Sequence, residues 1–161
     1  MPMYGPYAQT SPSGLTSWID DRRRPIPDHL RMMLGHLDGE EAFTYVIWRA
    51  PNPESILVRR SDIGETFIQA AGSADGMTIE VRQFGDDGKT HLYTVGKPQP
   101  AGGSTVLLPI SAERSVRVFE NEIFTGDEAA EIFAAFQGTD RVPDGFTLRE
   151  LDLSTDQPVK R

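Results

Sequence analysis

Two stretches of the chain place apolar residues at helical spacing. In the C-terminal stretch they recur at i, i+3, i+4 and i+7, which forms one apolar stripe of Ala129, Ile132, Phe133 and Phe136. Thr125 and Glu128 have the spacing of a capping box, and Gly138 is the residue type most often found just past a helix end. The sequence therefore predicts an amphipathic helix from Thr125 to about Gly138.

A second helix is predicted nearer the N-terminus. It opens at Pro27-Asp28 and ends at Asp38-Gly39. The same spacing places four apolar residues on one face: Leu30, Met33, Leu34 and Leu37.

Between and after these helices the pattern alternates between apolar and polar residues, or is rich in β-branched and aromatic residues, which favours strands. The candidate strands are 43–48, 56–59, 66–70, 77–82, 91–95, 105–110, 115–119 and 146–149. Gly85-Asp86-Asp87-Gly88 predicts a hairpin turn, and Trp48 is expected in the core. The fold class is therefore α+β, an antiparallel sheet of about five to seven strands with two main helices packed on it.

The chain ends differ in composition from its centre. Residues 1–14 are rich in Pro, Ser, Gly and Tyr and are predicted to be a flexible N-terminal arm, with a short helical turn possible over residues 15–21. Residues 15–155 are expected to form a single α+β domain, and residues 156–161 a flexible tail. A chain of 161 residues is long enough for one domain with a real core.

Negative charge is concentrated near the C-terminus. Residues 120–156 contain ten Asp and Glu against Arg141 and Arg149, a local net charge of −8 that equals the net charge of the whole chain. This surplus disfavours nucleic acid as a ligand and allows a basic protein partner. Candidate partner-binding residues are acidic: Glu120, Glu122, Asp127, Glu131, Asp86 and Asp87.

No catalytic or cofactor constellation is visible in the sequence. Its acidic pairs resemble turns, caps and solvated edges, so we expect no enzyme activity and no cofactor. Cysteine is absent, and His29 and His36 are seven residues apart on one predicted helix, about 10 Å, so no metal site is expected. No apolar run is long enough to span a membrane, and there is no secretory signal, so a cytoplasmic location is expected.

About half of the chain resembles a known group of proteins. The segments that carry the resemblance are 77–82, 91–96, 124–133 and 142–149. They resemble small actinobacterial immunity proteins of polymorphic toxin systems. The resemblance implies a non-enzymatic cytoplasmic protein that blocks a cognate secreted toxin.

The sequence thus favours an immunity protein that binds and neutralises a basic toxin through an acidic C-terminal surface. Complementary charge would speed encounter, and buried aromatic anchors would supply affinity. Two alternatives stay open at this point. One is a secretion-associated chaperone or another protein-interaction module, and the other is an enzyme of unrecognised family that uses scattered carboxylates.

Overall fold

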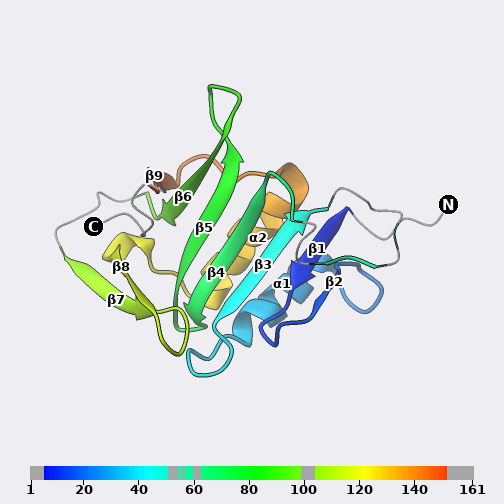
Figure 1. Cartoon of the computed structure of the whole chain (residues 1–161), viewed down its shortest axis with the longest axis horizontal. Helices are drawn as coiled ribbons and strands as arrows, with labels where there is room; N and C mark the ends of the chain where they lie inside the picture. The colour runs from blue at the N-terminus through cyan, green and yellow to red at the C-terminus, as the bar shows by residue number, and fades with distance from the viewer. Residues whose placement is uncertain (1–5, 51–54, 56, 60–62, 99–103, 152–161) are drawn as a thin grey trace.

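The computed structural model describes residues 6–50, 55, 57–59, 63–98 and 104–151. It is an α+β fold built on a seven-stranded antiparallel sheet with the strand order β2-β1-β3-β4-β5-β6-β9 (Figure 1). The strands of this sheet are β1 Tyr7–Thr10, β2 Thr16–Trp18, β3 Thr44–Arg49, β4 Phe67–Ser73, β5 Gly76–Phe84, β6 Thr90–Gly96 and β9 Thr147–Glu150. The predicted fold class is confirmed.

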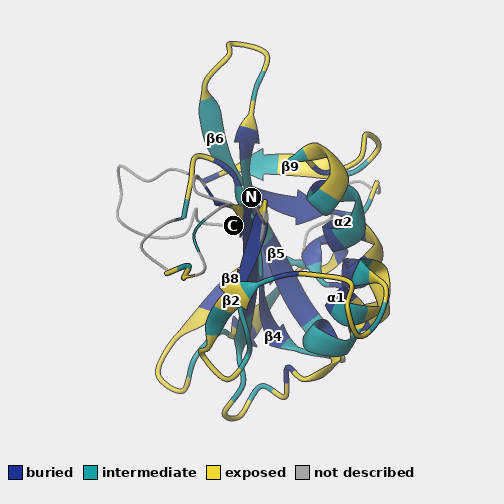
Figure 2. Cartoon of the chain, turned by 90° about the vertical axis from the view of Figure 1, so that its right-hand side faces the viewer, coloured by how far each residue is buried: buried dark blue, intermediate teal, exposed yellow. Residues whose placement is uncertain are grey.

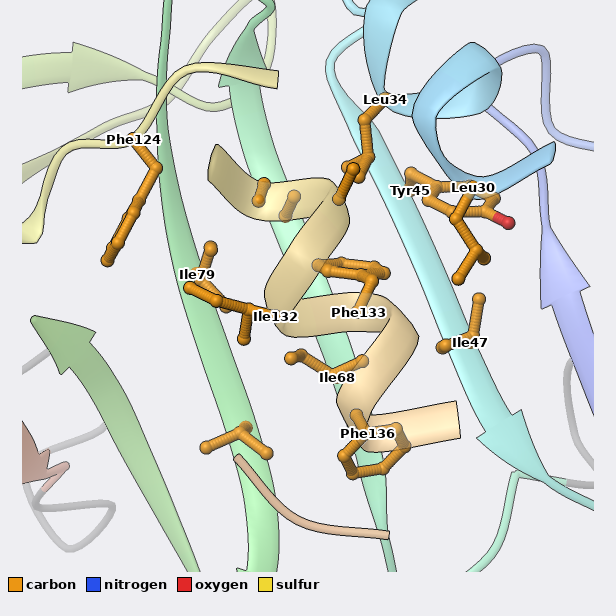
Figure 3. Packing of buried hydrophobic residues seen from close by; sticks show 14 of the residues in the cluster. Leu30, Leu34, Tyr45, Ile47, Ile68, Ile79, Phe124, Ile132, Phe133 and Phe136 are labelled. Carbon is orange, nitrogen blue, oxygen red and sulfur yellow. The ribbon is translucent and has the colours of Figure 1, made fainter. Parts of the chain in front are cut away.

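Both long helices, α1 (Ile26–Gly35) and α2 (Gly126–Thr139), lie on the same face of the sheet (Figure 2). Their apolar stripes meet inward-facing strand residues, and Phe133 of α2 stacks on Tyr45 of β3 with ring centroids 5.7 Å apart (Figure 3). The main core is this helix–sheet layer, which includes Leu30, Leu34, Tyr45, Ile47, Ile68, Ile79, Ile132, Phe133 and Phe136. Neither helix is long and apolar enough to cross a membrane.

The start of α2 has the predicted capping box. The Glu128 amide donates to the Thr125 hydroxyl at 3.2 Å, and the Thr125 amide donates to the Glu128 carboxylate at 2.9 Å. Gly138, expected just past the helix end, lies inside the helix, which continues to Thr139. Asp140, with φ of 62°, adopts the left-handed conformation that closes the helix.

The N-terminal prediction was also wrong. Residues 7–10 form β1, which pairs with β3 inside the sheet, and Tyr7 and Ala8 are almost fully buried. The possible helical turn over residues 15–21 is instead strand β2, which pairs with β1. β1 has little apolar content of its own. It is stabilised by hydrogen bonding along the edge of β3 that β4 leaves unpaired. Residues 1–5, and the predicted tail of 156–161, lie outside the described residues.

Two predicted strands pair with each other and not with the main sheet. β7 (Thr105–Pro109) and β8 (Ser115–Phe119) form a separate hairpin, which lies on the side of the sheet away from the helices (Figure 2). β7 contacts β4 and β5. A small cluster of Leu108, Val116 and Val118 forms the buried side of this hairpin.

Three further predictions are resolved by the structure. Trp48 is fully buried, as expected. The prediction of a strand over 56–59 was wrong for residues 57–59, which are not in a strand. Ile56 lies outside the described part of the chain. The final strand is present as β9, but Leu148 is 37% exposed because β9 forms the edge of the sheet.

Candidate functional site

The outer side of α2 carries three acidic side chains, Asp127, Glu128 and Glu131, which we call the acidic ridge. All three are exposed. Asp127 forms an ion pair with Arg31 of α1, with 3.3 Å between Nε and Oδ1. Glu131 has no ion-pair partner within the part of the chain that the structure describes. The structure therefore places two predicted partner-binding residues, Asp127 and Glu131, on one accessible surface.

The other predicted pair in this region was partly wrong. Glu120 and Glu122 lie in a single 3-10 turn, η2 (Glu120–Glu122). Glu120 is exposed, whereas Glu122 is 2% exposed. Both Glu122 carboxylate oxygens accept hydrogen bonds from Arg149 at 2.7 Å, and Oε1 also accepts from the Phe119 amide. Glu122 therefore holds η2 to β9 and is not available to a partner.

Asp86 and Asp87 are exposed in the turn between β5 and β6, which projects at one end of the sheet (Figure 1). The N-terminus of α2 is at the opposite end, because Phe124, just before the helix, bridges to Met77 at the start of β5. The nine residues of β5 separate these ends by about 30 Å. The six predicted residues therefore do not form one surface.

At the β5–β6 turn, His91 joins two carboxylates. Its Nδ1 lies 2.9 Å from a Glu150 oxygen and its Nε2 lies 3.0 Å from an Asp87 oxygen. Both contacts require an N–H on the imidazole, so they favour the doubly protonated ring. The hydrogen bonds that His91 donates to Asp87 and Glu150 raise the pKa of His91 above its ordinary value, against the opposing effect of burial. This cluster ties the turn to the edge strand β9.

A pocket of about 370 Å³ adjoins the acidic ridge. It lies between the outer flank of α2, the end of β6 and the turn that precedes β9. We call it the α2 pocket, and its lining residues are Lys97, Phe124, Glu128, Glu131, Ile132, Pro143 and Phe146. Two of its aromatic rings, Phe124 and Phe146, are 6.2 Å apart. The ridge thus borders an apolar recess and is not an isolated acidic surface.

Lys97 is the cation of the α2 pocket. Its Nζ lies 3.4 Å from the Glu128 carboxylate and 5.6 Å from the centre of the Phe124 ring. The backbone amide of Thr125 is the main cause that lowers the pKa of Glu128, and Lys97 adds to it against the effect of burial. Glu128 is therefore both the cap of α2 and the partner of an internal lysine.

The sequence predicted Asp127 and Glu131 of the ridge, but it did not predict the pocket. The α2 pocket brings together Lys97, Phe124 and Phe146, which are separated in the sequence by up to 49 positions. No local spacing encodes this contact. The only available signal was the alternation of Phe146 with Thr147, which predicted the side of the strand and not what it faces.

A second pocket, of about 540 Å³, lies at the end of α2 and includes Arg49, Asp140 and Arg141 among its lining residues. Beside it, the Asp140 carboxylate accepts hydrogen bonds from the Tyr7 hydroxyl and from Arg49 Nε, and Arg49 also donates to the Tyr7 oxygen at 3.2 Å. Burial, followed by the bond to Asp140, raises the pKa of Tyr7. These three side chains satisfy one another and tie β1 and β3 to the end of α2.

The described residues contain no group of three His, Asp or Glu side chains placed to hold a metal ion. Comparison with protein-family models, with curated proteins and with solved structures finds no match. The acidic ridge and the α2 pocket beside it are therefore the candidate site, on geometry alone.

Proposed function

We propose that this chain is an immunity protein that binds and neutralises a cognate basic toxin through the acidic ridge and the α2 pocket. The observation that carries the proposal is the exposed pair Asp127 and Glu131 beside an apolar recess on one surface of α2. The resemblance of residues 77–151 to immunity proteins supplies the class of partner.

The arrangement suits an inhibitor because inhibition requires contact and no chemistry. Interfaces commonly surround a desolvated apolar centre with a polar rim. Here the α2 pocket would supply the centre, while Asp127 and Glu131 would speed the approach of a basic surface. The toxin would be inhibited at the surface that the ridge covers.

The test takes the product of the gene adjacent to the gene for this chain, in which the proposal expects a toxin domain. Expressed alone, that domain should stop bacterial growth, and co-expression of this chain should restore it. Asp127→Lys combined with Glu131→Lys should slow association about tenfold at low salt and weaken its salt dependence, since charge acts mainly on encounter.

A matched control reverses two exposed carboxylates elsewhere, Glu65→Lys with Glu113→Lys, and should leave the association rate within about twofold of the wild type. A ridge variant that associates as fast as the wild type would remove the ridge from the interface. A neighbouring domain that is not toxic, or that does not bind this chain, would contradict the proposed function itself.

A further inference from the structure

The α2 pocket combines an apolar floor with an unbalanced charge. Phe124 and Ile132 are almost fully buried and form its floor, and Phe146 packs beside them. Its charged groups are two carboxylates, Glu128 and Glu131, and one ammonium group, so one negative charge is left unneutralised. A cationic guest would therefore restore neutrality.

The two carboxylates are not equivalent. Glu128 already accepts a hydrogen bond from the Thr125 amide and lies beside Lys97. Glu131 is exposed, and its carboxylate forms no hydrogen bond or ion pair with any other described residue. Glu131 is consequently the group of the pocket that is free to receive a donor.

The chain itself shows how this pocket accommodates a cation. The Lys97 ammonium lies over the Phe124 ring and pairs with a glutamate at the same time. A guanidinium group suits such a site better than an ammonium group, because it is planar, stacks on aromatic rings and can donate two parallel hydrogen bonds to one carboxylate. Its aliphatic stem would cover the apolar floor.

We propose that the α2 pocket receives an arginine side chain of the protein partner, with the guanidinium group paired to Glu131. The inference rests on the proposed function only in that the arginine belongs to the basic partner. It adds a specific recognition element to what would otherwise be general attraction between charged surfaces.

The test is an NMR titration of the isotope-labelled full chain with N-acetyl-arginine amide, and with N-acetyl-norleucine amide as the apolar control. The arginine compound should shift the backbone amides of Glu131, Ile132 and Phe146 and bind at least fivefold more tightly than the norleucine compound. Equal binding of the two compounds, or no shifts around the pocket, would overturn the proposal.

Three single variants sharpen the titration. Glu131→Gln should weaken arginine binding about fivefold, which corresponds to about 1 kcal/mol. Lys97→Met should strengthen it, because removal of the ammonium group leaves two unneutralised carboxylates in the pocket. Asp127→Asn is the matched control: it removes the same charge from the same helix, outside the pocket, and should change binding less than twofold. Equal losses in Glu131→Gln and Asp127→Asn would show general attraction and overturn the specific pairing.

The titration contains no toxin, so its outcome is separate from that of the growth assay. A chain that neutralises the toxin but does not discriminate arginine from norleucine would retain the proposed function and lose this inference. A chain that binds arginine in the pocket but does not bind the toxin would retain the pocket's chemistry and lose the function.

Discussion

The role of Glu122 in the fold differs from the role that the sequence predicted. By sequence it belongs to the acidic stretch and is a candidate for contact with a partner. In the fold it is buried and accepts hydrogen bonds from Nε and Nη2 of Arg149. A carboxylate removed from water needs such a partner, because its desolvation is costly.

Glu122→Ala should therefore act on stability and not on association. It leaves Arg149, whose side chain is only 21% exposed, without its carboxylate partner. We expect the free energy of unfolding to fall by about 3 kcal/mol, measured by urea denaturation. The double variant Glu122→Gln/Arg149→Met removes both charges and should recover part of the stability that Glu122→Ala loses. A Glu122→Ala variant as stable as the wild type would contradict the structural role of Glu122.

His91 makes the stability depend on pH in a defined direction. Because its pKa is raised in the folded protein by Asp87 and Glu150, its contribution is fully present below the unfolded value of about 6.5. That contribution is lost as the pH rises through the higher folded pKa. His91→Gln should therefore lower stability more at pH 5.5 than at pH 8.5.

Thermal unfolding of the wild type and His91→Gln at both pH values checks this prediction. The comparison must be between variants, because burial lowers the pKa of His29, and that group contributes in the opposite direction. An equal difference in stability at the two pH values would show that protonation of His91 is not linked to folding.

Helix α2 contributes to both the core and the candidate site. One side of the helix contributes Ala129, Ile132, Phe133 and Phe136 to the core, and the other side carries the acidic ridge. The periodicity that predicted burial thus also determined which acidic residues remain outside. Asp127 and Glu131 are exposed because the apolar stripe faces the sheet.

Replacing either core phenylalanine of α2 should be costly. Phe133 and Phe136 have no exposed surface, and Phe133 also stacks on Tyr45. Phe133→Ala or Phe136→Ala should lower the free energy of unfolding by about 3–5 kcal/mol in urea denaturation. Ala135→Ser, on a partly exposed position of the same helix, is the control and should change it by less than about 1 kcal/mol.

For the molecule as a whole, the N-terminal strand is structural. β1 covers the edge of β3, and Tyr7 connects β1 to Asp140 at the end of α2. The N-terminal strand and the end of α2 are therefore coupled through one hydrogen-bonded network. A segment poor in aliphatic residues is ordered by backbone pairing and by this network.

Deleting residues 1–10 should consequently unfold the protein or lower its thermal midpoint by more than 10 °C, since an edge and the buried Tyr7 and Ala8 are lost together. Circular dichroism melting measures the effect. Leu15→Ser, at a side chain that is 71% exposed, is the control and should melt near the wild-type temperature. A deletion variant with an unchanged melt would show that β1 is dispensable.

The elements that could be predicted from the sequence are those whose cause is local. They are the stripe and capping box of α2, the stripe of α1 and the β5–β6 hairpin. Each depends on residues that are close together in the sequence, whose spacing controls both hydrogen bonding and burial. These features predicted the α+β class and the exposed face that carries Asp127 and Glu131.

Three other features could not be predicted from the sequence, because they depend on contacts between distant segments. The pairing of β1 with β3 is made by backbone groups that carry no sequence pattern. The burial of Glu122 depends on Arg149, 27 residues away. The α2 pocket exists because Lys97, Phe124 and Phe146 meet in space, and no spacing along the chain records that meeting.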